Sequence, residues 1–323
     1  MTEIYKEIIT RMEAGKRSEL ITRYTPQGIR QELVEMTDEA PERAGLTFTE
    51  DPEGCTLTER FAPKARLIIL GGGHIALPLC EIAGLLDFEI WVYDDRPGFA
   101  NPARFPKARR VICDDFDNMR ERLNFRREDY VAVLTRGHRH DMLCLQILFR
   151  HGEIPNYVGM IGSKRRIAMV KAEAAAQIGN LAALDRLYAP IGLPIGSVTP
   201  AEIALSILAQ MVQVKRLDPV GESVDFALLH WLAAEREERT AIATIVSARG
   251  STPREAGAKM AVTDTGEIRG SLGGGCAEAE VVRQARSLID QGGYLLMEVD
   301  LTGQAEEEGM VCGGSMRVLI ESN

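Results

Sequence analysis

Long hydrophobic runs, paired cysteines and an excess of positive charge are all missing from this sequence. No apolar run approaches the roughly 18 residues that a membrane-spanning helix needs. The net charge of −9 argues against general nucleic-acid binding and against association with anionic lipid. Residues 1–20 form an amphipathic segment with acidic residues, which is atypical of a signal peptide. We therefore expect a cytoplasmic protein with no nucleic acid and no membrane among its partners.

Six cysteines are present, but none forms a CxxC pair, which argues against a zinc ribbon or a thioredoxin-like motif. In a reducing cytoplasm all six should be free thiols. Cys80, Cys113 and Cys144 fall in apolar strand or helix patterns, so we expect them to be buried like small hydrophobic residues. Cys276 and Cys312 differ, because each lies next to consecutive glycines.

The composition is that of an ordinary globular protein, with 45% apolar and 26% charged residues over 323 positions. That length favours two domains, each with its own core. Strands alternate with helices over residues 65–216, which predicts an α/β fold with a Rossmann-like parallel sheet. The last helix of this region should begin at the capping box formed by Thr199 and Glu202. Residues 226–323 predict a smaller α+β domain that bears the two glycine-flanked cysteines, and residues 217–225, LDPVGESVD, predict a linker.

Residues 1–64 predict one amphipathic helix and one short strand ahead of the Rossmann-like domain. The segment EAGKRSELIT at 13–22 follows a helix and leads into a strand, as EREERTAIAT at 235–244 does. Two interpretations stay open. Residues 1–64 are a degenerate copy of the C-terminal domain without its glycine loops, or two helix-to-strand turns are alike by chance.

The Rossmann-like unit begins with a strand at Leu67–Leu70 that runs into GGGHIA, a match to G-x-G-x-x-A with a helix behind it. Such glycines let a pyrophosphate approach the backbone at a helix N-terminus. A second strand ends at Asp94, where an acidic residue commonly binds a ribose hydroxyl. Asp95 and Arg96 leave the choice between NAD and NADP open. The residues that we expect to bind a nucleotide are Gly71, Gly73, His74, Ala76, Asp94, Asp95 and Arg96.

Two further segments follow strands of the same sheet. RGHRHD at 136–141 places two histidines and an aspartate at a strand's carboxyl end, where they could bind a metal or form the polar rim of a cleft. In YVGMIGSKRR at 157–166, a small residue pair precedes a basic helix start, which suits an anion or a solvated first turn equally. The candidate cleft-rim residues are Arg136, His138, His140, Ser163 and Lys164.

The cysteine-bearing half contains the motif GSLGGGCAEAE, in which three glycines precede Cys276 and a predicted helix. A helix N-terminus favours thiolate over thiol, and its free amides can hold a phosphate. Cys312 lies just before Gly313 and Gly314, and Arg254 and Lys259 could add positive charge. No Cys–His or Ser–His catalytic set is evident in this half. Chemistry alone therefore predicts a site for a large anionic ligand, either with a soft metal or without one.

These motifs together resemble the XdhC/CoxI family, the xanthine dehydrogenase accessory factors. VSARGSTPREAGAKM, GSLGGGC and CGGSMRVLIE resemble its cysteine-bearing domain. LIILGGGHIALPL, VLTRGHRHD, YVGMIGSKRR and PIGLPIGSVTPAEIALSI resemble its Rossmann domain. The resemblance covers residues 60–323, but the domain order is swapped, because the cysteine-bearing domain usually comes first.

The resemblance implies a molybdenum cofactor-binding chaperone rather than a stand-alone catalyst. Such a protein protects the cofactor (molybdopterin) and assists its sulfuration and insertion into molybdenum hydroxylases of the xanthine dehydrogenase type. The implied partners are that hydroxylase, a cysteine desulfurase-like sulfur donor and a second copy in a homodimer. The implied molybdenum contacts are the sulfurs of Cys276 and Cys312. The cofactor-binding residues are then Cys276, Cys312, Gly273, Gly274, Gly275, Gly313, Arg254 and Lys259.

Two rival hypotheses stay open. The first is an NAD(P)-dependent oxidoreductase that uses the Gly71 loop, with His138 or His140 in proton transfer. The second is a redox switch in which Cys276 and Cys312 form a disulfide and no cofactor is bound.

Overall fold

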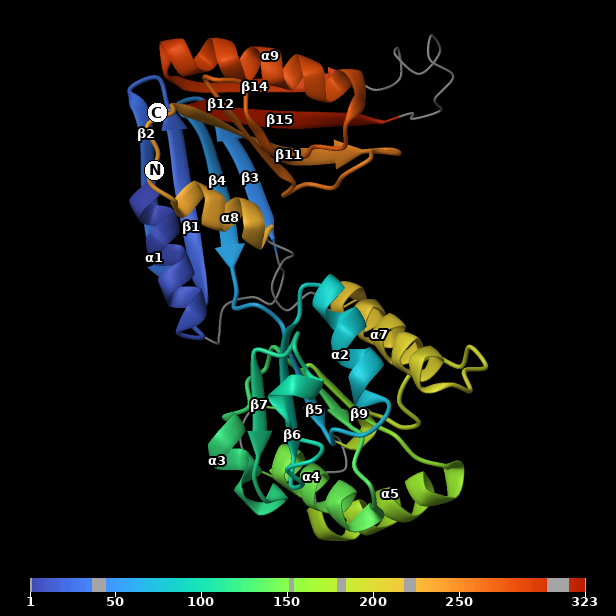
Figure 1. Ribbon diagram of the computed structural model, residues 1–323. Coiled ribbons are helices and arrows are strands. Elements are labelled where there is room, and N and C mark those ends of the chain that lie inside the picture. Colours follow the sequence, from blue (N-terminus) through green and yellow to red (C-terminus); the bar gives the residue numbers. More distant parts are fainter. Residues whose placement is uncertain are drawn as a thin grey trace. The chain divides into compact units, whose positions relative to one another are not determined.

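The computed structural model describes residues 2–36, 45–150, 154–178, 184–217, 225–300 and 314–322 (Figure 1). The chain divides into two compact units. Unit 1 comprises Met1–Pro63 together with Gly221–Asn323, and unit 2 is Lys64–Val220. Most of the predicted linker, residues 218–224, lies outside the described residues. Within the described ranges, no helix has the length and apolar character needed to cross a membrane.

Unit 2 contains a six-stranded sheet in the order β10-β9-β8-β5-β6-β7, with every neighbouring pair parallel. This is the strand order of a doubly wound Rossmann fold, and it confirms the predicted α/β class. The strands are β5 (Arg66–Leu70), β6 (Glu89–Asp94), β7 (Arg110–Cys113), β8 (Asp129–Val133), β9 (Tyr157–Met160) and β10 (Leu187–Tyr188).

Helices cover both faces of this sheet. One hydrophobic cluster joins it to α3, α4 and α5, and a second joins it to α2 and α7. The helix α7 begins at the predicted capping box, where Thr199 Oγ1 accepts the Glu202 amide and Glu202 Oε2 accepts the amides of Val198 and Thr199. The helices are α2 (Ala76–Leu85), α3 (Met119–Leu123), α4 (His138–Arg150), α5 (Lys164–Ile178) and α7 (Pro200–Leu217), with 3-10 turns at Pro102–Arg104 and Phe116–Asn118.

The three cysteines of unit 2 do not share one environment. Cys80 and Cys144 are buried, as predicted. Cys113 is exposed, so its predicted burial is wrong. It ends β7, which is an edge strand of the sheet, and an edge strand lacks a neighbour on one side.

Unit 1 begins with α1 (Thr2–Glu13) and a four-stranded antiparallel sheet in the order β2-β1-β4-β3. Its strands are β1 (Ser18–Thr25), β2 (Gly28–Glu35), β3 (Leu46–Asp51) and β4 (Gly54–Phe61). The sequence predicted the helix and only one strand. The strands β2, β3 and β4 escaped prediction. At least half of the residues of β2 and β3 are polar and none of them is buried, and β4 alternates partly exposed residues with buried ones that include Glu59.

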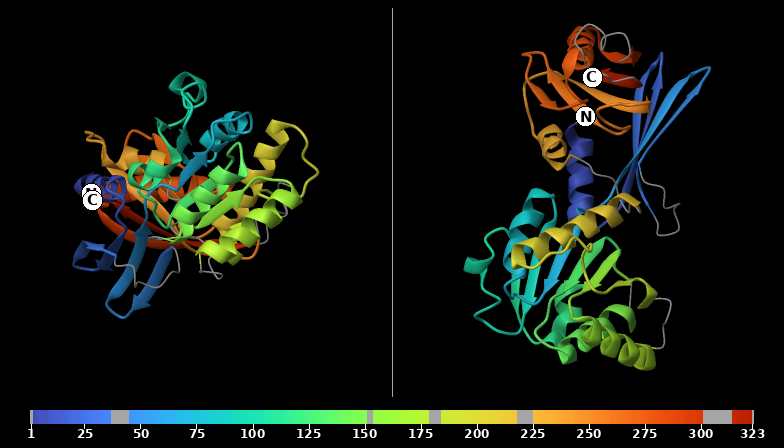
Figure 2. Two further views of the ribbon diagram at one scale, coloured as in Figure 1. Left: turned by 90° about the horizontal axis from the view of Figure 1, so that it is seen from below. Right: turned by 90° about the vertical axis from the view of Figure 1, so that its right-hand side faces the viewer.

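The C-terminal part of unit 1 forms a five-stranded antiparallel sheet in the order β13-β12-β11-β15-β14. The helix α9 packs on one face of this sheet, and α8 lies beside α1 (Figure 2). The elements are α8 (Phe226–Ala233), β11 (Thr240–Arg249), β12 (Lys259–Thr263), β13 (Ile268–Gly270), α9 (Gly275–Gln291), β14 (Gly293–Asp300) and β15 (Ser315–Ser322).

The two sheets of unit 1 pack against each other through their inward faces. Tyr24 and Leu57 of the first sheet share a cluster with Val246 and Leu319 of the second. Leu20 belongs to another shared cluster that includes α1 and α8. Residues at the two ends of the sequence therefore build one core.

A group of ionisable side chains lies within this core. The Tyr24 hydroxyl donates to Glu321 Oε2 at 2.9 Å. The Lys259 ammonium lies 2.7 Å from Glu59 Oε1 and donates to Thr244 Oγ1. Burial raises the pKa of Glu321, and the nearby carboxylate of Glu59 raises it further against the opposing effect of Lys259.

We predict that Glu321→Gln raises the free energy of unfolding at neutral pH. Because its pKa is raised, Glu321 keeps its carboxyl proton in the folded state at pH values above 4.5, where the unfolded chain has lost it. The free energy of unfolding of the parent therefore falls as the pH rises from 4.5 towards the folded-state pKa. Glutamine does not titrate and still accepts from Tyr24. Urea unfolding at several pH values should show a difference between variant and parent that grows with pH.

The matched control for this experiment is Glu59→Gln. It removes the charged partner of Lys259, whose side chain is 14% exposed, and should lower the free energy of unfolding by about 3 kcal/mol. If Glu59→Gln stabilised the protein as Glu321→Gln does, the assigned roles of the two carboxylates would be wrong.

Candidate functional site

The glycine triplet before Cys276 has a backbone that only glycine adopts readily. The φ angles of Gly273, Gly274 and Gly275 are +123°, +80° and +74°. Three successive residues with positive φ strongly disfavour any side chain. The helix α9 begins at Gly275, so Cys276 is in its first turn, as predicted.

Both glycine–cysteine segments approach one loop. A Cβ on Gly273 would lie 2.5 Å from Cγ of Pro253 and 3.6 Å from Cγ of Arg254. A Cβ on Gly314 would lie 2.7 Å from the carbonyl oxygens of Arg249 and Ser251. The turn 249–254, which leaves β11, therefore touches the segment before Cys276 and the segment after Cys312.

Within the described residues, the space beside the first glycines of α9 is open. There, a Cβ on Gly275 would meet no atom of another segment within 4 Å, and one on Gly274 would meet Glu278 Oε2 at 3.8 Å. Gly274 provides no side-chain cap for the helix. Ser271 accepts the Gly273 amide and donates to Glu278. The start of α9 is therefore a candidate for holding an anionic ligand on its backbone amides, with the Glu278 carboxylate at the same end.

The structure brings some predicted cofactor-binding residues together and separates one. Arg254 is exposed next to Gly273, whereas Lys259 turns into the core and pairs with Glu59. Cys312 and Gly313 lie outside the described residues, as does the side chain of Cys276.

In unit 2, the glycine loop after β5 is packed against its own chain. A Cβ on Gly71 would lie 2.5 Å from the carbonyl oxygen of Leu134, and one on Gly72 would lie 2.5 Å from that of Phe99. A Cβ on Gly73 would meet nothing within 4 Å. Two of these three glycines therefore serve internal packing.

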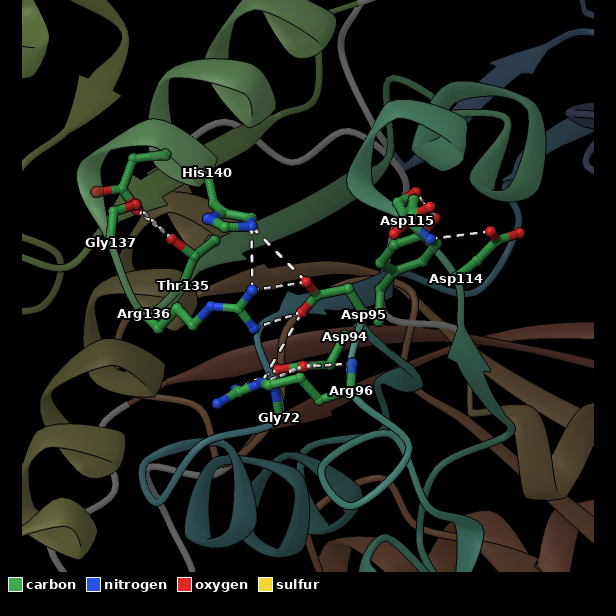
Figure 3. A network of polar contacts seen from close by, with 12 residues as sticks. Gly72, Asp94, Asp95, Arg96, Asp114, Asp115, Thr135, Arg136, Gly137 and His140 are labelled. Carbon is green, nitrogen blue, oxygen red and sulfur yellow. Dashed lines mark hydrogen bonds and ion pairs between the residues drawn. The ribbon is translucent and has the colours of Figure 1, made fainter.

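Asp94, the predicted ribose-binding residue, is 1% exposed. Its carboxylate accepts the Gly72 amide at 2.8 Å and the amide and guanidinium of Arg96 at 2.8–3.0 Å (Figure 3). Burial raises its pKa, but the Arg96 guanidinium and the Gly72 amide outweigh this and leave the pKa lowered. A ribose would have to displace Arg96 to reach this carboxylate. This is not the arrangement expected of a ribose-binding residue, although nucleotide binding itself stays a prediction.

The loop that follows Asp94 also lies against the glycine loop. The Phe99 ring stacks against the Arg96 guanidinium, with 3.7 Å from Cζ to the ring centroid. Arg104 donates to the Gly72 carbonyl at 3.3 Å. Neither Phe99 nor Arg104 was predicted to lie here, because nothing in their local pattern indicates where the loop folds back.

The rim residues after β8 are engaged in ion pairs. Arg136 donates two hydrogen bonds of 2.8 Å to Asp95, and His140 Nε2 lies 3.7 Å from the same carboxylate (Figure 3). Ser163 accepts the Arg166 amide at the start of α5, where Lys164 is exposed.

The potential metal ligands of RGHRHD diverge. His140 faces Asp95, whereas His138 is 4.0 Å from Glu173 on α5. Asp141 is fully buried and accepts from Thr135 at 2.6 Å and from Arg166 at 2.7 Å. Among the described residues, no group of three His, Cys, Asp or Glu side chains could hold a metal ion. In this arrangement the segment organises the strand end.

Two family models match the chain. The XdhC Rossmann domain matches residues 67–211, and the XdhC and CoxI family model matches residues 233–300. The chain belongs to the XdhC and CoxI family. Residues 1–66 lie outside both matches.

Curated relatives match about half of the chain. One, a protein of Bacillus subtilis (strain 168) named as a probable xanthine dehydrogenase subunit, is 30% identical over 158 residues, which are 49% of this chain and 45% of that protein. Another, the uncharacterized protein YqeB of Escherichia coli (strain K12), is 31% identical over 160 residues, which are 49% of this chain and 29% of that protein. The match therefore spans less than half the length of either relative.

A solved structure supports the same family. The crystal structure described as a xanthine dehydrogenase from Bacillus halodurans aligns with a TM-score of 0.52 and 27% identity. The alignment covers 69% of this chain and 67% of that one.

The glycine loop of unit 2 allows a matched pair of substitutions. Gly72→Ala should lower the free energy of unfolding by about 2–3 kcal/mol, because its Cβ would overlap the Phe99 carbonyl. Gly73→Ala should stay within about 0.5 kcal/mol of the parent, because its Cβ would meet open space. Urea unfolding measures both. Equal losses would show that the loop is not packed as described.

Proposed function

We propose that this protein is an accessory factor that binds molybdenum cofactor and serves a molybdenum hydroxylase of the xanthine dehydrogenase type. In this role it protects the cofactor and assists its sulfuration and its insertion into the hydroxylase. One observation carries the proposal: both glycine–cysteine segments approach the turn 249–254, although they are far apart in the sequence. Family membership and the name of the Bacillus subtilis relative support the link to xanthine dehydrogenase.

The residues present fit such a cofactor. Its phosphate is an anion, and the uncapped start of α9 offers backbone amides beside exposed Arg254. Among the described residues, the space beside Gly274 and Gly275 is open, which leaves room for a ligand to approach that backbone. The cofactor, when bound, supplies a soft metal centre for which cysteine thiolates are suitable ligands. Cys276 and Cys312 would hold the metal, and Gly273, Gly274 and Gly275 would hold the phosphate.

The chain's own contribution under this proposal is binding and shielding rather than catalysis. A helix N-terminus in general favours the thiolate form of a nearby cysteine, which is the form that ligates metals. The hydroxylase and a cysteine desulfurase-like sulfur donor would meet the cofactor at this edge of unit 1. A homodimer and a cytoplasmic location belong to the same proposal.

An NAD(P)-dependent oxidoreductase is the less favoured function. The Rossmann strand order favours it, but the carboxylate that would bind the ribose is held by Gly72 and Arg96. Fluorescence titration with NADH and NADPH separates the two functions, because micromolar binding with turnover would support the oxidoreductase.

We predict that Cys276→Ser and Cys312→Ser each lower cofactor retention by about tenfold, since serine is a poor ligand for a soft metal. The proteins would be produced in cells that synthesise molybdopterin, and molybdenum and pterin would be measured after gel filtration. Cys113→Ser is the control, because Cys113 is an exposed thiol in unit 2.

Parent protein that retains no cofactor would contradict the proposal, as would full retention by the double serine variant. A loss of two hydrogens from Cys276 and Cys312 under mild oxidant, without bound metal, would instead support the redox switch.

A further inference from the structure

The two sheets of unit 1 share a four-stranded topology, to which the second sheet adds β13. In the first, β1 lies between β2 and β4, with β3 beyond β4. In the second, β11 lies between β12 and β15, with β14 beyond β15. All of these pairs are antiparallel, and one helix precedes each sheet, α1 or α8. The strands β1, β2, β3 and β4 therefore correspond to β11, β12, β14 and β15.

The strand registers make this correspondence specific to single residues. Across the first sheet, one row of directly paired residues runs Leu33, Leu20, Glu59, Leu46. Across the second sheet, the corresponding row runs Ala261, Ile242, Glu321, Tyr294. When the strands are aligned so that the residues of the two rows match one to one, three pairs of buried residues that face the opposite sheet are identical. These pairs are Thr22 and Thr244, Leu57 and Leu319, and Glu59 and Glu321.

Contacts between the two sheets hold both of these glutamates. Glu321 of the second sheet accepts a hydrogen bond from Tyr24 of the first. Glu59 of the first sheet pairs with Lys259 of the second. Each glutamate is therefore held by a side chain of the opposite sheet, although the two partners come from strands that do not correspond, β1 for Tyr24 and β12 for Lys259.

The two sheets differ where the cysteines are. Between β12 and β14, the second sheet carries β13, the glycine triplet and α9, whereas β2 and β3 are joined by residues 36–45. Between β14 and β15 it carries residues 301–314, whereas β3 and β4 are joined by residues 52–53 alone. Both cysteine-bearing segments thus occupy positions at which the first sheet has a short connection.

We propose that residues 2–61 are a second copy of the cysteine-bearing domain that lacks both cysteine segments. On this proposal, the inward face of the β11–β15 sheet is an interaction surface for a copy of its own fold. In this chain residues 2–61 occupy that surface, so each chain holds one cysteine site and one internal partner for it. The inference does not depend on molybdenum cofactor.

The inward face of the β11–β15 sheet needs a partner because it is apolar. The β11–β15 sheet is covered by α9 on one face, and its other face presents Ile242, Val246 and Leu319. Each of these side chains is at most 5% exposed in the presence of residues 2–61. Val246 and Leu319 pack on residues of the first sheet, and without that sheet they would face water.

A chimeric chain tests the proposal directly. Residues 226–322 would replace residues 2–61, and the rest of the chain would stay unchanged. The chimera should be monomeric by light scattering and unfold cooperatively within about 5 °C of the parent, since a true copy restores the same core. The control is the same chimera with Leu319→Asp in the added copy only, which places an unpaired carboxylate in that core. A chimera that aggregates, or that melts as early as this control, would overturn the proposal.

Deletion of residues 2–61 provides a second, separate test. The exposed surface should then pair with that of another chain, and the truncated protein should be a dimer that Leu319→Asp dissociates. A folded, soluble monomer would overturn the proposal, because it would show that this face needs no copy of its own fold.

Discussion

The structure of unit 1 depends on the packing of one antiparallel sheet over the inward face of another. The β11–β15 sheet is apolar on both faces, and α9 covers only one of them. Such a sheet is stable only when both faces are removed from water. Residues 2–61 cover the second face of this sheet, yet they lie outside both matched family segments. The segment that carries the family motifs therefore relies on a segment that carries none of them.

This packing also explains how the cysteine segments can be built from glycine. Gly273, Gly274 and Gly275 contribute no side-chain packing, and ordering them costs more backbone entropy than ordering other residues. That cost has to be offset elsewhere, and α9 and the paired sheets provide the buried apolar area that offsets it. The conformation of these loops is then not required for packing of the core, and under the proposed function it serves ligand binding.

Much of the fold follows from local signals in the sequence. The turn at Gly71, the capping box at Thr199 and the helix start at Gly275 each depend on a few adjacent residues, and all three were predictable. The role of Asp94 was not, because the local pattern places an acid at a strand end but cannot show that Arg96 and Gly72 occupy it. The strands β2, β3 and β4 were missed for a related reason: their polar residues become ordered only through pairing with neighbouring strands.

The two glycine-rich loops show why glycine content alone does not identify a ligand site. At Gly71 and Gly72, a side chain would collide with the chain's own backbone, so these glycines are required by packing. At Gly274 and Gly275, the positive φ excludes a side chain, but no backbone atom of the described chain fills the space that it would take. Open space over uncapped amides is what an anionic ligand requires. The start of α9 meets that requirement, and for this reason the proposed function places the ligand there and not over the Asp94 carboxylate.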